Sequence, residues 1–379
     1  MRARGSMHRS LGTLVAVLAS AGVAATTGSG LVLAASEVAI QGQITATAVP
    51  SGAAPVQLLA GSDGSLWFVT AGSQLGEISS SGQASLTPVT LPHGNVTATL
   101  AAAGPEGVWA YGNTLDYTDQ TFGCTVTLVQ PGGGVLQPAL PASTLNHFCA
   151  DAAADAQGNL WVAFSVERVS YCTCRPGMVA EISPSGKVVI WDLVRPGALP
   201  RVVTLGSDGA IWVLEGYVTE NIARYTATGP PSPGISTYGR QTGLWSRSDG
   251  SFWWEAPRYC SGLPYPICPR VGIITQAGVI SLSIILPVTY ANFSGDKSLS
   301  PSPDGSLWMA GYEKDGISRF FRVDGTGTVD RSPAFPSGTS GAALQADGPI
   351  AVTTDGTAWA VAGDGTATYV VRFAPAPGS

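Results

Sequence analysis

Short apolar runs, each broken by polar turn residues, make up most of this chain, and no helical period links them. The first unit has four such runs, at residues 56–60, 66–70, 75–78 and 84–91. Runs of this length bounded by Gly, Ser and Asp are typical of β-strands. We therefore expect a four-stranded unit, whose strands we call a, b, c and d in chain order. The third unit repeats the plan, with strand c at 178–182 and strand d at 188–194.

A tryptophan recurs in strand b of every unit, almost always four residues after the acidic or amide residue of a tight turn. The spacing between copies is 41 to 55 residues. Self-similar units of this length with turn signals predict a β-propeller, in which each unit is one four-stranded antiparallel blade. The seven copies are Trp67, Trp109, Trp161, Trp212, Trp253, Trp308 and Trp359. A fixed position in every blade favours packing between blades over ligand binding.

The turn before each tryptophan joins strands a and b. Six copies are Asp-Gly or Gln-Gly, beginning with Asp63-Gly64, and Glu106-Gly107 is one residue shorter. Asp-Gly between apolar runs favours a two-residue hairpin turn with positive φ at both central residues. We expect that turn in each blade.

The last repeat lacks its fourth strand, and an additional strand precedes the first repeat. After Trp359 there is room for strand c at 368–373 but not for strand d, and residues 43–50 read like the d strands elsewhere. Pairing the two would close the ring and remove its exposed edges. We therefore predict an all-β fold, a single seven-bladed propeller over residues 43–375 whose last blade is completed by the N-terminal strand.

Residues 1–35 read as a secretory signal peptide. Arg2, Arg4 and Arg9 precede an uncharged run from residue 11 to residue 35, with small-residue cleavage candidates. An uncleaved membrane anchor is the alternative, because the run is long enough to span a bilayer. We expect an extracellular or cell-surface protein that contacts the membrane only through an uncleaved leader.

Charge excludes one class of partner. Charged residues make up 12% of the chain and only three are lysines. Without residues 1–35, which hold three arginines and no acid, the formal net charge falls from −6 to −9. Such a surface argues against nucleic-acid binding. We expect a monomer that binds a small molecule, peptide or glycan.

Six cysteines in an exported chain favour disulfides over metal binding. We expect all of them on the face of the b–c and d–a connections, here called the loop face. Cys260 and Cys268 bracket a short loop that a bridge could close. The other four allow three pairings, and a Cys172–Cys174 bond would be strained, which favours pairing these two with Cys124 and Cys149. A Cys-x-Cys metal site is the alternative.

Tyrosines gather in or beside the b–c connections. Tyrosine combines a large apolar face with a hydroxyl, which suits recognition of sugars, peptides or ring compounds. Packing of long loops on one another is the alternative explanation. The residues that we predict to bind a ligand are Tyr111, Tyr171, Tyr217, Tyr259, Tyr312 and Arg258.

The repeated turns and the strand c patterns Leu75-Gly76-Glu77-Ile78 and Val179-Ala180-Glu181-Ile182 resemble the virginiamycin B lyase (streptogramin lyase) propellers and, more loosely, NHL-repeat propellers. The resemblance implies a Mg²⁺-dependent elimination that opens cyclic depsipeptides, with histidine and glutamate on the loop face of the late blades. This chain departs from that pattern: its histidines are His8, His93 and His147, and none follows. The family's histidine base therefore has no counterpart.

Three residues remain as catalytic candidates. Glu215 closes strand b of blade four, and Glu255 sits near the matching place in blade five. We expect both to point toward the mouth of the central channel. His147 starts the third a strand and would serve as an acid or base near neutral pH. Pairing of the glutamates with Arg258 or Arg201, and a loop-capping role for His147 beside Cys149, are the structural alternatives. No cofactor is indicated, with Mg²⁺ implied only if the lyase reading holds.

Two functions follow from these observations. The first is an exported binding or scaffold protein that presents a tyrosine-rich, disulfide-braced loop face and lacks the lyase activity. The second is a Mg²⁺-dependent C–O lyase of the virginiamycin B lyase type. The histidine deficit favours the first, because a shared fold says little about chemistry.

Overall fold

A computed structural model describes residues 37–92, 94, 96–116, 121–166, 177–194, 198–216, 219–238, 241–259, 267–286, 299–312 and 315–376. These residues belong to one compact unit, 32–379. They form β-strands and one 3₁₀ turn, η1 (Ala142–Thr144). No helix in the described part of the chain is long and apolar enough to cross a membrane. The predicted leader, residues 1–35, lies outside the described residues.

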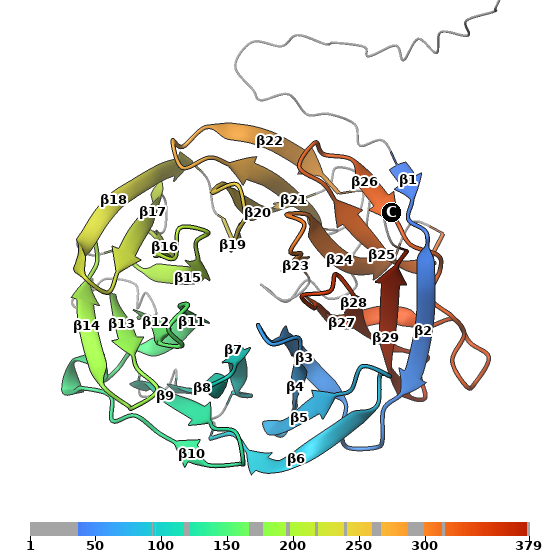
Figure 1. Cartoon of the computed structure of the whole chain (residues 1–379), viewed down its shortest axis with the longest axis horizontal. Helices are drawn as coiled ribbons and strands as arrows, with labels where there is room; N and C mark the ends of the chain where they lie inside the picture. The colour runs from blue at the N-terminus through green and yellow to red at the C-terminus, as the bar shows by residue number, and fades with distance from the viewer. Residues whose placement is uncertain are drawn as a thin grey trace, which may run out of the picture. The chain divides into compact units, whose positions relative to one another are not determined.

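The strands form seven antiparallel blades arranged in a ring (Figure 1). The first three blades are β3 (Pro55–Ala60), β4 (Leu66–Thr70), β5 (Gln74–Ile78) and β6 (Ala84–Thr90); β7 (Thr99–Gly104), β8 (Gly107–Asp116), β9 (Thr121–Val129) and β10 (Val135–Leu136); and β11 (Phe148–Ala154), β12 (Leu160–Ser165), β13 (Met178–Ile182) and β14 (Val188–Asp192). The predicted strands of blades one and three lie within one or two residues of these bounds.

The fourth, fifth and sixth blades follow the same order. They are β15 (Pro200–Leu205), β16 (Ile211–Glu215), β17 (Thr219–Thr226) and β18 (Gly229–Tyr238); β19 (Gly243–Ser246), β20 (Phe252–Tyr259), β21 (Ile267–Ile274) and β22 (Ile280–Ile285); and β23 (Leu299–Pro301), β24 (Leu307–Tyr312), β25 (Ser318–Val323) and β26 (Val329–Arg331). The seventh has β27 (Gln345–Val352), β28 (Ala358–Gly363) and β29 (Thr368–Pro375) from the end of the chain. The predicted seven-bladed, all-β fold is confirmed.

The N-terminal strand closes the ring as predicted. β2 (Gly42–Ala48) pairs antiparallel with β29, from Gly42 opposite Pro375 to Ala48 opposite Tyr369. Just before it, β1 (Glu37–Ala39) runs parallel to β26 as a fifth strand of blade six. The start of the described chain therefore joins the outer edges of the last two blades (Figure 1).

The a–b turns differ from the two-residue turn that we expected. In blade one the Gly64 N–H donates to the Gly61 carbonyl at 3.1 Å, and the Gly61 N–H donates to the Ser65 carbonyl at 2.8 Å. This is a three-residue loop in which only Gly64 has positive φ, at 85°. Asp63 therefore keeps an ordinary backbone, and its carboxylate accepts bonds from the Ser65 N–H and hydroxyl. The expectation of positive φ at both residues is wrong.

The repeated tryptophans pack between blades, as predicted. Each belongs to a core cluster that joins its own blade to the next; Trp253, for example, packs with Leu307, Met309 and Phe321 of blade six. Six of the seven are at most 5% exposed, and Trp67 is half-buried. Turn contacts add to this: the Trp253 indole donates to the Gly305 carbonyl of the next blade's turn at 2.9 Å.

Strand a of every blade faces the central axis. The a strands together line a cavity of about 330 Å³, here called the axial cavity. Side chains tie neighbouring a strands across it: the Gln57 amide exchanges two 2.8 Å bonds with the Leu100 backbone, and Asp151 Oδ2 accepts the Val203 N–H at 2.8 Å. These contacts hold neighbouring a strands together around the cavity.

Candidate functional site

The loop face of blades two and three is held by a covalent and a polar link. Cys124 of β9 is bonded to Cys149 of β11, with 5.5 Å between their Cα atoms. The Asn113 side chain of β8 exchanges two 2.9 Å hydrogen bonds with the Cys149 backbone. Together the two links join strands b and c of blade two to the first strand of blade three.

This disulfide corrects the cross-pairing that we favoured. Because a Cys172–Cys174 bond would be strained, we had paired these two cysteines with Cys124 and Cys149. In the structure, strands of adjacent blades bring Cys124 and Cys149 together instead. Cys172, Cys174 and Cys260 lie outside the described residues. Cys268 lies in β21, opposite Arg258 of β20. The predicted Cys260–Cys268 bridge stays a prediction.

Two hairpins extend well past the ring on the loop face. In blade one, β4 ends at Thr70, three residues past its tryptophan, whereas β8 continues to Asp116 and β20 to Tyr259. β8 and β9 stay paired from Val108–Val129 to Asp116–Thr121. The bridged Cys124 lies in the first of these hairpins, opposite Asn113.

Glu215 lies at the interface of blades three and four. Its side chain is fully buried, and its Oε1 accepts a hydrogen bond from the Tyr225 hydroxyl and one from the Val194 N–H at 3.4 Å. Tyr225 packs against Trp161 of blade three. Burial, and then the negative charge of Glu215, raise the pKa of Tyr225 well above its usual value, so this hydroxyl stays a donor.

Glu255 faces the opposite way. It is 2% exposed, and its Oε2 accepts from the Thr242 hydroxyl at 3.3 Å. Glu255 follows Trp253 by two residues, so it shares the face that packs on blade six, whereas Glu215 follows Trp212 by three and faces blade three. The expectation that both point toward the channel mouth is wrong: both are buried between blades, and neither lines the axial cavity.

The two glutamates do not form one metal site. In the part of the chain that the structure describes, no three His, Cys, Asp or Glu side chains lie close enough to hold an ion. Two carboxylates hold one Mg²⁺ ion only if both come within about 2.1 Å of it. Glu215 and Glu255 face different interfaces and therefore do not fit the ion that the lyase resemblance implies.

His147 and Arg201 have structural contacts. His147 is 1% exposed, its Nδ1 lies 3.2 Å from the Leu145 carbonyl, and it precedes the bridged Cys149 by two residues. Arg201 donates to the Gln241 carbonyl at 2.7 Å. The structure therefore places His147 next to the bridged Cys149 at the start of the third a strand.

The predicted tyrosines divide among several positions. Tyr111 is 6% exposed, packs with Trp109 and lines the axial cavity. Tyr312 is half-buried at the end of β24, and Tyr259 ends β20. Tyr171 and Tyr217 lie outside the described residues. Tyr111 is thus a core residue, and the ligand-binding role of the set stays a prediction.

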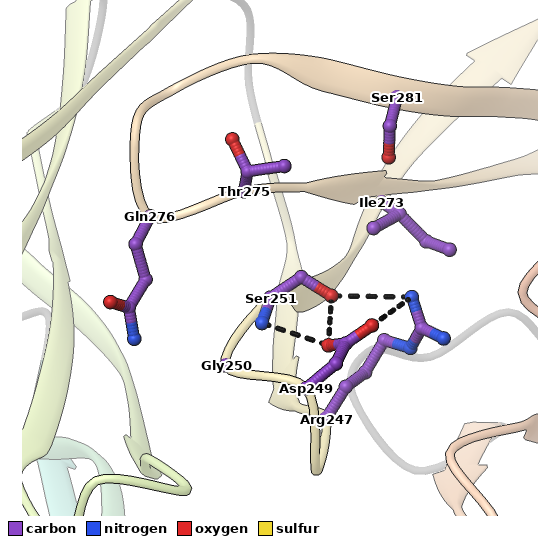
Figure 2. A pocket seen from close by; sticks show the side chains of 8 residues that line it. All are labelled: Arg247, Asp249, Gly250, Ser251, Ile273, Thr275, Gln276 and Ser281. Carbon is purple, nitrogen blue, oxygen red and sulfur yellow. Dashed lines mark hydrogen bonds and ion pairs between the residues drawn. The ribbon is translucent and has the colours of Figure 1, made fainter.

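The a–b and c–d turns form the opposite face, here called the turn face. It carries clusters of polar residues that we did not predict as a site. Figure 2 shows Arg247 beside Asp249 and Ser251, around a hollow of about 260 Å³. Its guanidinium lies 3.3 Å from Asp249, donates to the Gly305 carbonyl and covers the Trp253 ring. Burial raises the pKa of Asp249, but hydrogen bonds from Ser251 and the charge of Arg247 together hold it below its usual value.

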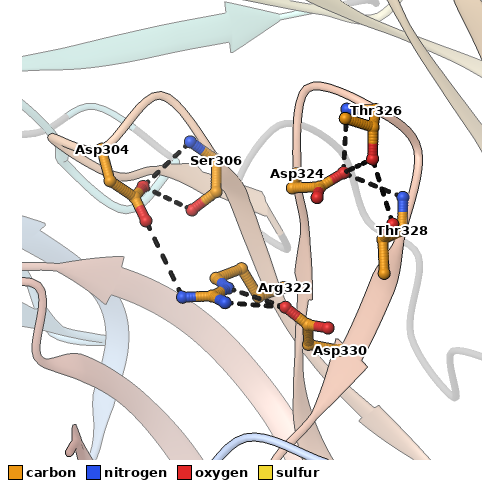
Figure 3. A network of polar contacts seen from close by, with 7 residues as sticks. All are labelled: Asp304, Ser306, Arg322, Asp324, Thr326, Thr328 and Asp330. Atoms are coloured by element: carbon orange, nitrogen blue, oxygen red, sulfur yellow. Dashed lines mark hydrogen bonds and ion pairs between the residues drawn. The ribbon is translucent and has the colours of Figure 1, made fainter. Parts of the chain in front are cut away.

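Blade six repeats this arrangement with an arginine from strand c. In Figure 3, Arg322 donates to Asp330 at 2.7 Å and lies 3.9 Å from Asp304, whose carboxylate accepts from the Ser306 N–H and hydroxyl. Asp324 of the c–d turn accepts from Thr326 and Thr328 in the same way. The register could have predicted this, because the strand c residue opposite the repeated tryptophan is arginine here and at Arg224.

No protein-family model and no curated protein sequence matches this chain. Among solved structures, a streptogramin B lyase aligns over 88% of this chain and 98% of its own, at a TM-score of 0.56 and 17% identity. A catalytically inactive virginiamycin B lyase from Staphylococcus aureus with quinupristin aligns over 89% and 100%, at 0.57 and 14%. YCF48 bound to D1 peptide aligns over 91% and 99%, at 0.54 and 11%. At these identities the similarity shows the fold alone. In that respect the predicted resemblance to streptogramin lyases is confirmed.

Proposed function

We propose that this chain, which has the seven-bladed fold of the streptogramin lyases, is an exported binding or scaffold protein that uses its loop face. The observation that carries the proposal is the pair of links between blades two and three, the Cys124–Cys149 bond and the Asn113 clamp, which would brace that face. A surface that is ordered before binding loses less entropy when a ligand arrives. A propeller core does not need such a brace, since its blades already pack through the repeated tryptophans.

The ligand class is a small molecule, peptide or glycan. The low lysine count and the negative net charge disfavour nucleic acid. The structure of YCF48 bound to D1 peptide is a precedent for a peptide on a propeller of this shape. The b–c tyrosines, with Arg258, supply the aromatic faces and hydroxyls for such a ligand.

Binding is tested on an array of peptides and glycans with the purified chain lacking residues 1–35. We expect saturable binding of at least one array member, lost on reduction of the disulfides and in the double variant Tyr217→Ala with Tyr259→Ala. Circular dichroism and thermal unfolding of the variant show that the fold is kept. Binding that survives both treatments would place the ligand elsewhere on the molecule.

A Mg²⁺-dependent lyase is the second candidate, favoured by the shared fold with two streptogramin lyases. In that case Glu215, Glu255 or His147 would act as an acid or base in the elimination. The test is incubation with a streptogramin B antibiotic, with Mg²⁺ or with chelator, followed by chromatography and mass spectrometry. Elimination opens the ring at constant mass, whereas hydrolysis adds water.

We expect no product. A Mg²⁺-dependent product of unchanged mass would establish the lyase and overturn the binding proposal. In that event, loss of turnover in Glu215→Ala or Glu255→Ala would support our residue assignment, and unchanged turnover in both would refute it.

A further inference from the structure

Blade five differs from the other blades at the first residue of its a–b turn. In six blades the N–H of this residue donates to the carbonyl four positions on, as the Arg247 N–H does to the Ser251 carbonyl at 2.9 Å. The residues at the other five positions are uncharged or acidic, namely Gly61, Asp155, Gly206, Ser302 and Thr353. Blade five therefore places a cation where these five blades have none.

The Arg247 side chain is held in place on the turn face. Its guanidinium lies over the Trp253 ring at 5.4 Å, and its Nε donates to the Gly305 carbonyl at 3.2 Å. Its Nη1 donates to the Ser251 hydroxyl at 3.2 Å and lies 3.3 Å from Asp249 Oδ2. The Arg247 side chain is 15% exposed, whereas the Asp249 side chain is 55% exposed. Asp249 is therefore fixed by the arginine and still open to a ligand.

These residues form one wall of the hollow in Figure 2, here called the blade-five pocket. The hairpin of β21 and β22 forms the other wall, with Ile273, Thr275, Gln276 and Ser281. Figure 2 shows the Ser281 hydroxyl directed from the hairpin toward the first wall. The Thr275 hydroxyl accepts the Val279 N–H at 3.1 Å, which closes the hairpin turn. Both walls therefore present polar side chains to one pocket.

The lining residues suit a ligand with several hydroxyl groups. The charges of Arg247 and Asp249 cancel, so the pocket favours neither an anion nor a cation. Asp249 can accept a hydrogen bond from one ligand hydroxyl while the guanidinium beside it donates to the next, and bonds to charged groups are strong. The hydroxyl of Ser281 and the amide of Gln276 can both donate and accept. Ile273 offers an apolar contact to the C–H groups of a sugar ring.

The size of the pocket narrows the choice. Sites for drug-sized ligands measure roughly 300–1,000 Å³, so the blade-five pocket, at about 260 Å³, suits a single sugar ring. Arg247 also lines a cavity of about 860 Å³ formed by the a–b turns, here called the turn cavity. Hydroxyl residues at the second position of four a–b turns line this cavity, namely Ser62, Ser207, Ser248 and Thr354. Further sugar units would therefore meet hydroxyl groups there.

We propose that the turn face binds a neutral oligosaccharide, with one sugar ring in the blade-five pocket and the neighbouring units in the turn cavity. Asp249 and Arg247 hold adjacent hydroxyls of that ring, and Ser281 contacts it from the hairpin. The turn cavity adds the carboxylates of Glu106 and Asp155, which would repel an acidic saccharide. This site does not depend on the binding function proposed for the loop face.

Isothermal titration calorimetry of the purified protein with matched trisaccharides tests the proposal. Maltotriose, cellotriose, mannotriose and tri-N-acetylchitotriose are neutral, and trigalacturonate carries a negative charge on every unit. We expect saturable one-site binding of at least one neutral trisaccharide, little changed by added salt, and weaker or no binding of trigalacturonate. No binding of any neutral trisaccharide, or tighter binding of trigalacturonate, would overturn the proposal.

Variants on the two walls locate the site. Asp249→Asn keeps an acceptor for the Ser251 N–H but removes the charge, and should weaken binding of the trisaccharide about tenfold. Arg247→Ser, which copies Ser302 of blade six, should weaken it by a similar factor. Ser281→Leu changes an exposed residue of β22, so the fold should be kept while the larger side chain fills the pocket and abolishes binding.

Asp355→Asn is the matched control. It makes the same change at the same position of the a–b turn in blade seven, and Asp355 is not among the residues that line either cavity. Its titrations should match the wild type. Reduction of the disulfides, which should abolish binding to the loop face, should leave saccharide binding unchanged.

Circular dichroism and thermal unfolding show whether each variant keeps the fold. If Arg247→Ser does not fold, Asp249→Asn and Ser281→Leu still decide the matter. Unchanged saccharide binding in both would place the ligand elsewhere on the molecule and refute the site.

Discussion

The turn face and the loop face of this propeller are stabilised in different ways. On the turn face, the same three-residue loop recurs in blade after blade, with a glycine at positive φ and, in most copies, an aspartate that accepts bonds from the residue two positions on. On the loop face, blades two and three are joined by one disulfide and one asparagine that no other described blade repeats. Turn contacts that repeat in each blade stabilise the ring. Contacts that occur once, between residues far apart in sequence, shape the loop face, which can therefore differ from blade to blade.

The largest effect should come from the core that both faces share. Trp253→Ala removes a fully buried indole and its bond to the Gly305 carbonyl, and should lower the free energy of unfolding by about 3–5 kcal/mol. Urea denaturation followed by circular dichroism measures the loss. Trp67→Ala is the matched control at the same repeat position; because Trp67 is half-buried, its loss should be smaller. Equal losses would contradict the view that burial between blades sets the energy.

Breaking the loop-face disulfide comes next. The double variant Cys124→Ser with Cys149→Ser opens a crosslink between residues 25 apart in sequence, and should cost about 2–4 kcal/mol. Unfolding of oxidised wild type and of the variant gives the difference. The variant should keep its propeller circular dichroism spectrum, because the blades do not depend on the bond. If the variant is as stable as the wild type, the bond does not brace this face.

The Asn113 clamp should contribute less. Asn113→Ala removes two hydrogen bonds to the Cys149 backbone and leaves its groups without those partners, which should cost about 1–3 kcal/mol. Double-mutant analysis with the cysteine variant shows whether the two links act together. We expect coupling, because both hold the same backbone segment. Strictly additive losses would mean that the links are independent.

The smallest effect should appear on the turn face as a dependence on pH. Burial raises the pKa of Asp355, but hydrogen bonds from Thr353 and Thr357 outweigh this and hold it below its usual value. A lowered folded-state pKa contributes stability that is complete above the unfolded value, near 4, and is lost as the pH falls further. Asp355→Asn should therefore lower the free energy of unfolding by less than about 1 kcal/mol at pH 7, and by a smaller amount at pH 3. Unfolding curves at both values check this, and equal losses at both would contradict it.

Much of the fold could be predicted because its signals are local. The bounds of β4 and β13 and the pairing of the N-terminal strand with β29 agree with apolar runs and turn residues read along the chain. The turn type was missed because Asp-Gly suits both a two-residue loop and a three-residue loop, and the choice depends on one further backbone bond from Gly61 to Ser65.

The candidate site could be predicted only in part. Glu215 and Glu255 were correctly placed in strand b, but a shift of one residue relative to the repeated tryptophan turns them to opposite faces of their blades. Tyr111 looked like a loop residue because β8 is longer than other b strands, and it lies in the core.

The sequence by itself determined the number of blades, their strand order and the closure of the ring, because turn chemistry and the tryptophan period act within one repeat. Only the tertiary structure decided that Cys124 bonds Cys149, that the two glutamates face different interfaces, and that Arg247 donates to the Gly305 carbonyl of the next blade. Each of these depends on which residues of different blades lie opposite one another. The residue spacing within a single blade does not encode contacts between blades.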